Sequence, residues 1–374
     1  MAGGKSRGDA ARAEEMKARA VPASLGAAGL SLGVLAVIAT GAVLQAARSV
    51  VIPLVVAWLL SYLLAPAVNF LVKRLRIPAV VSVLAVVVLL VALLWGAGMV
   101  AQQRLVSFVK NYPAYQGKIA GVLDMYAQRL HVPADWLEVN DWTSHLTGAV
   151  LKISRFFIGF VSYSVLVLVF LVFMLLARPY SDAKLRKAFE KSPERAETVI
   201  EISRRISLQI TRYLGTLFVV SLLTGLTVWG ALEWMGVEFS FAWGLLAFVL
   251  NFIPTVGSIV ASIPPVLMML VQKAPDFWPA AGVAGVLFVI QQLFGNFVGT
   301  KLYGDRLNLS PVVILLFLLL WGWLWGIAGA LLAVPIAAAI QITLEQIPAL
   351  KPLAVLMGSG KRYAKPGRRG LRGI

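Results

Sequence analysis

Long apolar runs separated by short polar stretches fill most of the chain between residues 24 and 346. A helix needs about 20 apolar residues to cross a hydrocarbon core of about 30 Å. Plain runs of this kind lie at 24–47, 50–71, 79–101, 156–177, 213–235 and 279–299. Two longer runs, 240–271 and 310–346, are interrupted by polar and glycine residues. The pattern predicts an all-α polytopic membrane protein with about eight hydrophobic segments.

Polar and helix-breaking residues interrupt the first long run at Asn251, Pro254, Thr255, Gly257 and Ser258. Pro254 lacks a backbone donor and disfavours helix at the residue before it, so we expect two short helices with a break near 251–257. Broken backbone within a membrane persists where protein or a watery cavity satisfies it, which makes this break the leading candidate site. The alternative is that Pro254 and Gly257 only kink a packed helix.

A second interrupted run follows about seventy residues later. Residues 310–335 contain Gly322, Gly326 and Gly329 and end at Pro335. Ser240 matches Ser310, Gly257 approximates Gly329, and Pro264 approximates Pro335. Two interrupted hydrophobic segments in corresponding positions are typical of a transporter's binding region. The carboxyl half is therefore predicted to contain a weak internal repeat of two broken or re-entrant helices.

Two topologies are compatible with these interruptions. If 240–271 crosses once, its helix would be about 48 Å long, well beyond a core of about 30 Å unless it is strongly tilted. If it is a re-entrant hairpin, the arm before the break is about 18 Å long, enough to reach mid-membrane and turn back. Hairpins in both runs would give an inverted repeat and would place Lys273 outside and Lys301 inside. We favour the hairpins and leave the long kinked spans open.

The composition supports a membrane protein and limits the partners. Hydrophobic residues make up 59% of the chain and charged residues 14%, and the mean hydropathy is +0.84. The net charge of +17 arises from Lys and Arg in the tails and in loops between the spans, as in cytoplasmic loops that face anionic lipid. We therefore predict contact with the anionic leaflet and no binding of nucleic acid. The chain has no Cys, which excludes disulfides and thiolate chemistry.

Charge and hydropathy together divide the chain into seven regions. Residues 1–22 read as a disordered cytoplasmic tail, and 347–374, with seven basic and no acidic residues, as a basic cytoplasmic tail. The predicted order between them is spans one to three at 23–101, an external helical insert at 102–154, span four at 155–178, a cytoplasmic amphipathic helix at 179–212 and a transport core at 213–346. Both termini are predicted to be cytoplasmic.

The candidate chemistry is neutral. The chain shows no catalytic, cofactor or metal motif, and His131 and His145 lack ligand spacing with the nearby acids. Neutral hydrogen-bonding groups remain near the breaks and on the intervening span, at Asn251, Thr255, Ser258, Gln292 and Asn296, with Gly326 and Gly329 at the second break. Such groups suit a small hydroxyl-rich solute better than a cation, although Asn and Gln also serve as interhelical hydrogen-bond donors.

Several of these segments resemble the autoinducer-2 exporter family of bacterial inner-membrane proteins. The residues that carry the resemblance are NFIPTVG at 251–257, SIPP at 262–265, GN at 295–296, LSPVVILLFLLLWGWLWGIAGALLAVP at 309–335, and the closing LEQ and AVLMG. The order of spans and inserts is also similar. The resemblance implies export of a small polyol-like signal, with homo-oligomers, pentamers among them, as the expected assembly.

The resemblance also leaves other functions open. Some relatives are proposed to be sodium (lithium)/proton antiporters, and a non-transporting membrane scaffold is the third alternative. After the Gly-Asn pair, relatives commonly have a proline, often preceded by an acidic residue, where this chain has Gly299 and Thr300. Since proton and sodium sites generally need a carboxylate within the membrane, antiport has less support in this chain.

Overall fold

The computed structural model describes residues 23–96, 98–100, 164–253, 256–273, 276–294 and 309–359. These residues are helical apart from short turns, and their one isolated β-bridge joins Leu309 to Gly358. The predicted all-α fold is therefore confirmed. The predicted tail at 1–22, the insert at 102–154 and most of the second tail lie outside the described residues.

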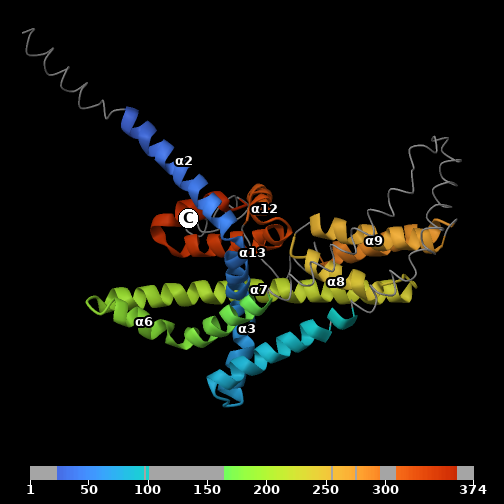
Figure 1. The fold of residues 1–374 in the computed structure, drawn as a ribbon, viewed down its shortest axis with the longest axis horizontal. Coiled ribbons are helices and arrows are strands. Elements are labelled where there is room, and N and C mark those ends of the chain that lie inside the picture. Colours follow the sequence, from blue (N-terminus) through green and yellow to red (C-terminus); the bar gives the residue numbers. More distant parts are fainter. Residues whose placement is uncertain are drawn as a thin grey trace, which may run out of the picture. The chain divides into compact units, whose positions relative to one another are not determined.

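The described helices follow the predicted runs closely (Figure 1). The amino half contains α2 (Ala23–Ala46), α3 (Arg48–Arg74), a helix at Ala79–Val100, and one that begins at Ser164 and continues through η2 (Arg178–Tyr180) and α6 (Ser181–Ala188). The carboxyl half contains α7 (Pro193–Trp234), α8 (Ser240–Leu250), α9 (Val256–Gln272), α10 (Trp278–Gln291), α12 (Pro311–Trp325), α13 (Ile327–Gln346), η5 (Pro348–Leu350) and α14 (Lys351–Met357).

Five of the described helices are long and apolar enough to cross a membrane by length and composition. They are Arg48–Arg74, Ala79–Val100, Ser164–Ala188, Pro193–Trp234 and Ile327–Gln346. Helix α2 belongs to a separate unit, Met1–Val51, and is itself a 24-residue apolar helix. These spans, together with the shorter apolar helices between them, are those of a polytopic membrane protein.

Three hydrophobic clusters hold the remaining described helices together. The amino-half cluster joins α3 to the next two spans through Ala57, Val68, Val83, Val86, Val87, Leu171 and Leu175. The central cluster joins α3, α7 and α13 through Leu59, Ile210, Tyr213, Leu214, Leu217, Leu309, Ala337, Ala338 and Ala339. The hairpin cluster joins α7, α8, α9 and α10 through Val228, Leu232, Val237, Ala247, Ala261, Met268, Met269, Ala280, Val283, Leu287 and Ile290.

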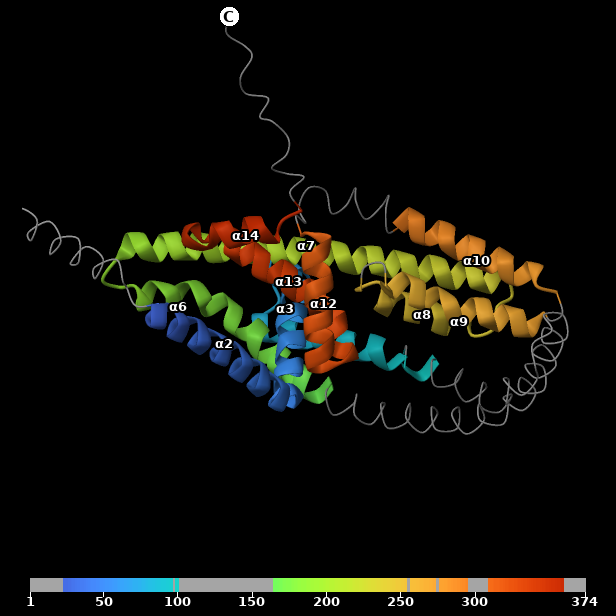
Figure 2. The ribbon, with the colours of Figure 1, turned by 90° about the horizontal axis from the view of Figure 1, so that it is seen from above.

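Helix α7 takes part in two of these clusters. It has 42 residues, so it is about 63 Å long, roughly twice the hydrocarbon core. Its carboxyl half packs along α8 and α10, and its middle packs on α13 (Figures 1 and 2). The predicted amphipathic helix and the predicted fifth span are therefore one continuous helix. It begins at Pro193, a residue well suited to the first turn of a helix, and the side chain of the preceding Ser192 makes no capping bond.

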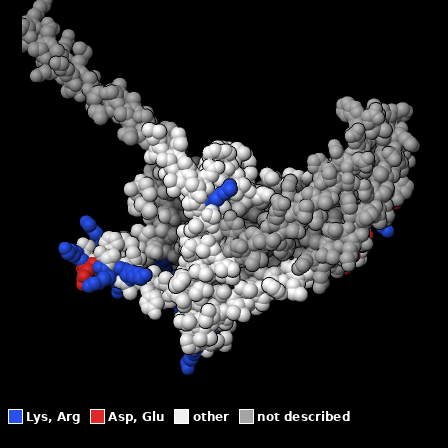
Figure 3. Space-filling model, in the orientation of Figure 1, with Lys and Arg blue, Asp and Glu red and all other residues white. Residues whose placement is uncertain are grey.

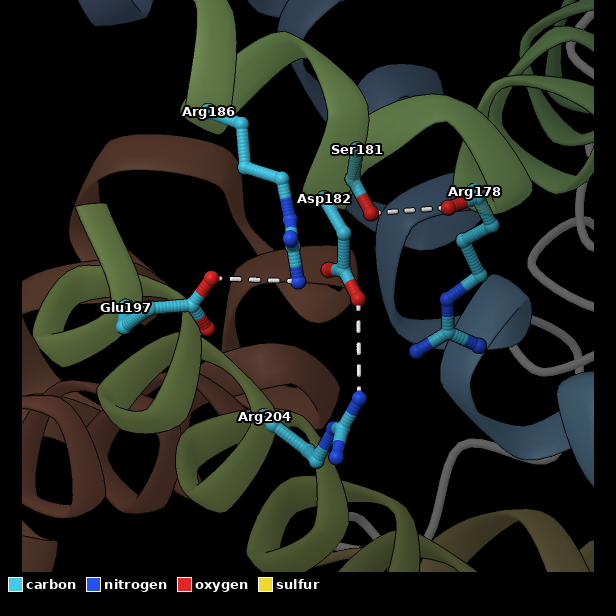
Figure 4. Close-up of polar contacts among 6 residues, drawn as sticks. All are labelled: Arg178, Ser181, Asp182, Arg186, Glu197 and Arg204. Atoms are coloured by element: carbon cyan, nitrogen blue, oxygen red, sulfur yellow. Dashed lines mark hydrogen bonds and ion pairs between the residues drawn. The ribbon is translucent and has the colours of Figure 1, made fainter. Parts of the chain in front are cut away.

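The amino end of α7 pairs with α6 through charged side chains. Arg186 contacts Glu197 at 3.1 Å and Arg204 contacts Asp182 at 3.6 Å (Figure 4), and Arg205 pairs with Glu201 within α7. Charged residues gather on this end of the molecule in Figure 3, over α6 and the start of α7. All of these side chains are solvent-exposed, so the ion pairs add little to the stability of the protein. The number of charges indicates that this region lies in water.

Candidate functional site

The first interrupted run forms a helical hairpin. Helix α8 ends at Leu250 and α9 begins at Val256, so the predicted break near 251–257 is present. At the open end of the hairpin the chain returns to its starting point: the backbone N–H of Glu238 donates to Gln272 Oε1 at 3.1 Å, and Gln272 Nε2 donates to the Gly236 carbonyl at 3.4 Å. The end of α9 therefore lies beside the start of α8. A single crossing by 240–271, which the sequence left open, is wrong.

Gly257 allows the two arms of this hairpin to meet. A Cβ atom at Gly257 would lie 1.8 Å from the carbonyl oxygen of Leu250 and 2.7 Å from its carbonyl carbon. Real Cβ atoms essentially never come closer than 3.0 Å to another heavy atom, and both of these atoms are backbone, which cannot rotate away. The turn after Leu250 is thus closed in a way that only glycine permits at position 257.

Two small contacts hold the first break against α7. Asn251 Nδ2 donates to Ser221 Oγ at 3.0 Å, and Ser221 is fully buried. One turn further along, Gly225 faces Gly244 so closely that a Cβ at either position would lie 2.8 Å from the other's carbonyl oxygen. The hydrogen bond supports the interhelical interpretation of Asn251, whose side chain is only partly buried.

The second interrupted run repeats this architecture. Helix α12 ends at Trp325, α13 begins at Ile327, and Gly326 between them has φ 65° and ψ −140°, a backbone conformation open essentially only to glycine. A Cβ at Gly329 would lie 1.8 Å from the carbonyl oxygen of Trp321. The start of α12 is held by the chain beyond α13, because the N–H of Ser310 donates to the carbonyl of Met357, at the end of α14 (Lys351–Met357), at 2.8 Å.

The glycine contacts support the correspondence of the two hairpins more strongly than the sequence match does. In each hairpin a glycine in the first turn of the second arm contacts a carbonyl in the last turns of the first arm: Gly257 with Leu250, and Gly329 with Trp321. Ser240 begins α8, and Ser310 is the amino-terminal cap of α12. The predicted correspondences of these serines and glycines thus occupy equivalent places in the two hairpins.

The other predicted site residues are only partly placed. Ser258 is half-buried on α9, and Gln292 is exposed in a π-helical turn that follows α10. Gly326 is exposed, whereas Gly257 and Gly329 are buried. Pro254, Thr255 and Asn296 lie outside the described residues.

The described residues do not bring the two breaks into contact. Phe252, in the first break, packs on the central cluster, whose α13 members are Ala337 to Ala339. These alanines lie about three helical turns beyond Gly326. A common path lined by both breaks therefore remains a prediction.

Sequence reasoning missed four of the contacts described here. Ser221 and Gln272 gave no signal, since neither is near a motif. Gly225 and Gly244 could have been noticed as glycines within apolar runs, where a close helix approach is their usual purpose. The contacts of Arg178 were also missed: its Nη1 donates to the Ser61 carbonyl at 2.9 Å, and its guanidinium lies 4.5 Å from the Tyr62 ring centre.

The chemistry available at the breaks is neutral hydrogen bonding. Within the described part of the chain, no group of three or more His, Cys, Asp or Glu side chains could hold a metal ion. The polar groups at the first break are an amide and hydroxyls, from Asn251, Ser221 and Ser258. A scaffold of spanning helices that carries two broken hairpins with neutral polar groups defines a helical membrane protein of the transporter class.

The chain belongs to the AI-2E family of transporters. The sequence profile described as "AI-2E family transporter" matches residues 32–349. A protein of Borreliella burgdorferi is 31% identical over 84% of this chain and 86% of its own length. The "AI-2 transport protein TqsA" of Escherichia coli is 31% identical over 88% of this chain and 94% of its own. The "Sodium-lithium/proton antiporter" of Halobacillus andaensis is 26% identical over 81% and 90%.

Proposed function

We propose that this transporter exports a small neutral polyol-like signal of the autoinducer-2 type across a bacterial inner membrane, along a path lined by its two broken helices. The 31% identity to a protein named for autoinducer-2 transport supports the substrate class. The neutral groups at the first break support it from chemistry, because an uncharged solute with several hydroxyls exchanges hydrogen bonds with amides and hydroxyls without needing a counter-ion.

The duplicated hairpin is the observation that carries the proposal. Helix α8 has 11 residues and α12 has 15, so these arms are about 17 and 22 Å long. Arms of this length, entering from a membrane surface, end inside a hydrocarbon core of about 30 Å. Backbone that is broken at this depth needs partners other than lipid, and a polar path supplies them.

A membrane topology is part of the same proposal. With a cytoplasmic amino terminus, α7 carries the chain outward, the first hairpin enters from outside, α10 returns, and the second hairpin enters from inside. The ion-paired end of α7 and the basic tail then face the anionic cytoplasmic leaflet. Assembly as a homo-oligomer belongs to the same proposal.

Efflux of autoinducer-2 from proteoliposomes tests the export and the role of Asn251. Asn251→Leu removes both a hydrogen bond to Ser221 and any contact with solute, whereas Ser221→Ala removes only the first. We expect Asn251→Leu to abolish efflux and Ser221→Ala to reduce it only modestly. Asn69→Leu, the same exchange at an exposed position of α3, is the matched control and should leave efflux unchanged.

Two outcomes would contradict the proposal at different points. Equal losses of efflux in Asn251→Leu and Ser221→Ala would mean that Asn251 only ties the break to α7. Asn251 would then not be a residue that contacts the solute. No efflux from the unaltered protein would remove the export itself.

Antiport of sodium or lithium against protons is the second candidate, because one relative carries that name. The same vesicles distinguish it, since a sodium gradient would then move protons in the absence of any organic solute. Export without proton movement would exclude antiport. If the protein moved neither the solute nor protons, a non-transporting membrane scaffold would be the remaining alternative.

A further inference from the structure

Three tryptophans mark the end of the first arm of the second hairpin. Trp323 is 73% exposed and faces away from the protein, whereas Trp325 is only 6% exposed. Trp321 is partly buried, and its carbonyl oxygen is the atom against which Gly329 packs. Trp321 and Trp325 lie one turn apart on one face of α12, with ring centres 4.5 Å apart and ring planes inclined at 49°.

The indole N–H of Trp321 is the exception to an otherwise satisfied structure. Its Nε1 atom is inaccessible to solvent and has no hydrogen-bond partner, the one side-chain nitrogen or oxygen among the described residues for which this is true. A buried donor without an acceptor destabilises a protein by about 1–3 kcal/mol, so such groups usually have a purpose or an absent partner. Phenylalanine at this position would avoid that cost, although its smaller ring would leave a gap where the rest of the indole lies.

The surroundings hold this donor in place, and the exposed end of the break lies close to it along the helix. The contact between the Trp321 carbonyl and Gly329 fixes the backbone of the tryptophan, and the Trp325 ring supports its side chain. Gly326, five residues further along, is exposed, and a Cβ there would meet no atom within 4 Å. A fixed donor without a partner thus lies about a turn and a half along the chain from the exposed glycine of the break.

We propose that Trp321 Nε1 donates a hydrogen bond to a hydroxyl or carbonyl oxygen of the transported solute at the second break. The Trp325 ring beside it supplies an apolar face for the C–H side of a polyol. The assignment rests on the proposed export and gives the solute its contact in the second hairpin, where no Asn, Gln, Ser or Thr lies between Ser310 and Gln341. An N–H donor also discriminates against cations, which need oxygen ligands.

Trp321→Phe tests this assignment, with Trp323→Phe as the matched control on the exposed side of the same helix. The loss of one neutral hydrogen bond should raise the half-saturating concentration of autoinducer-2 in proteoliposome efflux by about fivefold. The thermal midpoint of Trp321→Phe should change little, because removal of an unsatisfied donor offsets the packing lost with the smaller ring. Trp323→Phe should behave as the unaltered protein in both measurements.

A second measurement separates this inference from the export on which it rests. In purified protein with ¹⁵N-labelled tryptophan, the indole signal that Trp321→Phe removes should shift on addition of autoinducer-2 and not on addition of sodium chloride. An unchanged signal or an unchanged half-saturating concentration in Trp321→Phe would each overturn the assignment. A shifted signal in a protein that moves no solute would refute the proposed export but would support the contact of Trp321 with the solute.

Discussion

Replacing Gly257 by alanine should separate the arms of the first hairpin. The added Cβ would lie 1.8 Å from the Leu250 carbonyl oxygen and 3.3 Å from the Ile253 Cβ. Ordinary contacts of this kind are 3.4 Å or longer, so α8 and α9 must move apart by more than 1 Å. No rotamer change relieves the overlap, because the main obstacle is backbone.

The expected loss of stability can be worked out from two opposing terms. Overpacking by one methyl group usually destabilises by about 1–3 kcal/mol, and a clash with backbone belongs at the upper end. Alanine regains about 0.5–1 kcal/mol over glycine within a helix, which leaves a net loss of about 2 kcal/mol. At about 2–4 °C per kcal/mol, the thermal midpoint should fall by about 4–8 °C.

Thermal unfolding of the purified protein in detergent, followed by loss of the monodisperse peak in gel filtration, measures this shift. Gly230→Ala is the matched control, because Gly230 lies within α7 and a Cβ there meets no atom within 4 Å. It should raise the midpoint by about 1–4 °C. If Gly257→Ala and Gly230→Ala unfold at the same temperature, the hairpin is not closed by the contact of Gly257 with Leu250.

Two further predictions concern other contacts and the topology. Arg178→Lys keeps the charge but loses the planar guanidinium that contacts both the Ser61 carbonyl and the Tyr62 ring, so it should destabilise the protein by about 1–2 kcal/mol. This loss of stability should be smaller in a Tyr62→Leu background. Additive losses from the two substitutions would refute the contact. In this Cys-free chain, Lys273→Cys should react with an impermeant thiol reagent from outside and Tyr303→Cys only after the membrane is opened, and reaction of both from one side would refute the hairpin topology.

The breaks could be predicted from the sequence because they depend on residues with unusual backbone chemistry. Pro254 and Gly257 locate the first interruption and the glycines at 322–329 locate the second, whatever surrounds them. Hydropathy likewise predicted the spans, since a helical run of about 20 apolar residues is typical of a segment that crosses a membrane.

The fold of the interrupted runs could not be decided from the same signals. A hairpin and a tilted crossing both bury the same apolar residues, so hydropathy is equal for the two. The difference lies in contacts between distant residues, such as Gln272 with Gly236 and Ser310 with Met357. Likewise, the partner of Asn251 is Ser221, thirty residues earlier, and no local pattern identifies such a pair.

The continuity of α7 has a mechanical consequence. Pro193 at its first turn is its only proline, so no residue of the usual kink-forming type interrupts the helix between the segment paired with α6 and Trp234. The charged contacts with α6 and the apolar contacts of the hairpin cluster therefore share one continuous backbone about 60 Å long, and a displacement of one end as a rigid body would also displace the other.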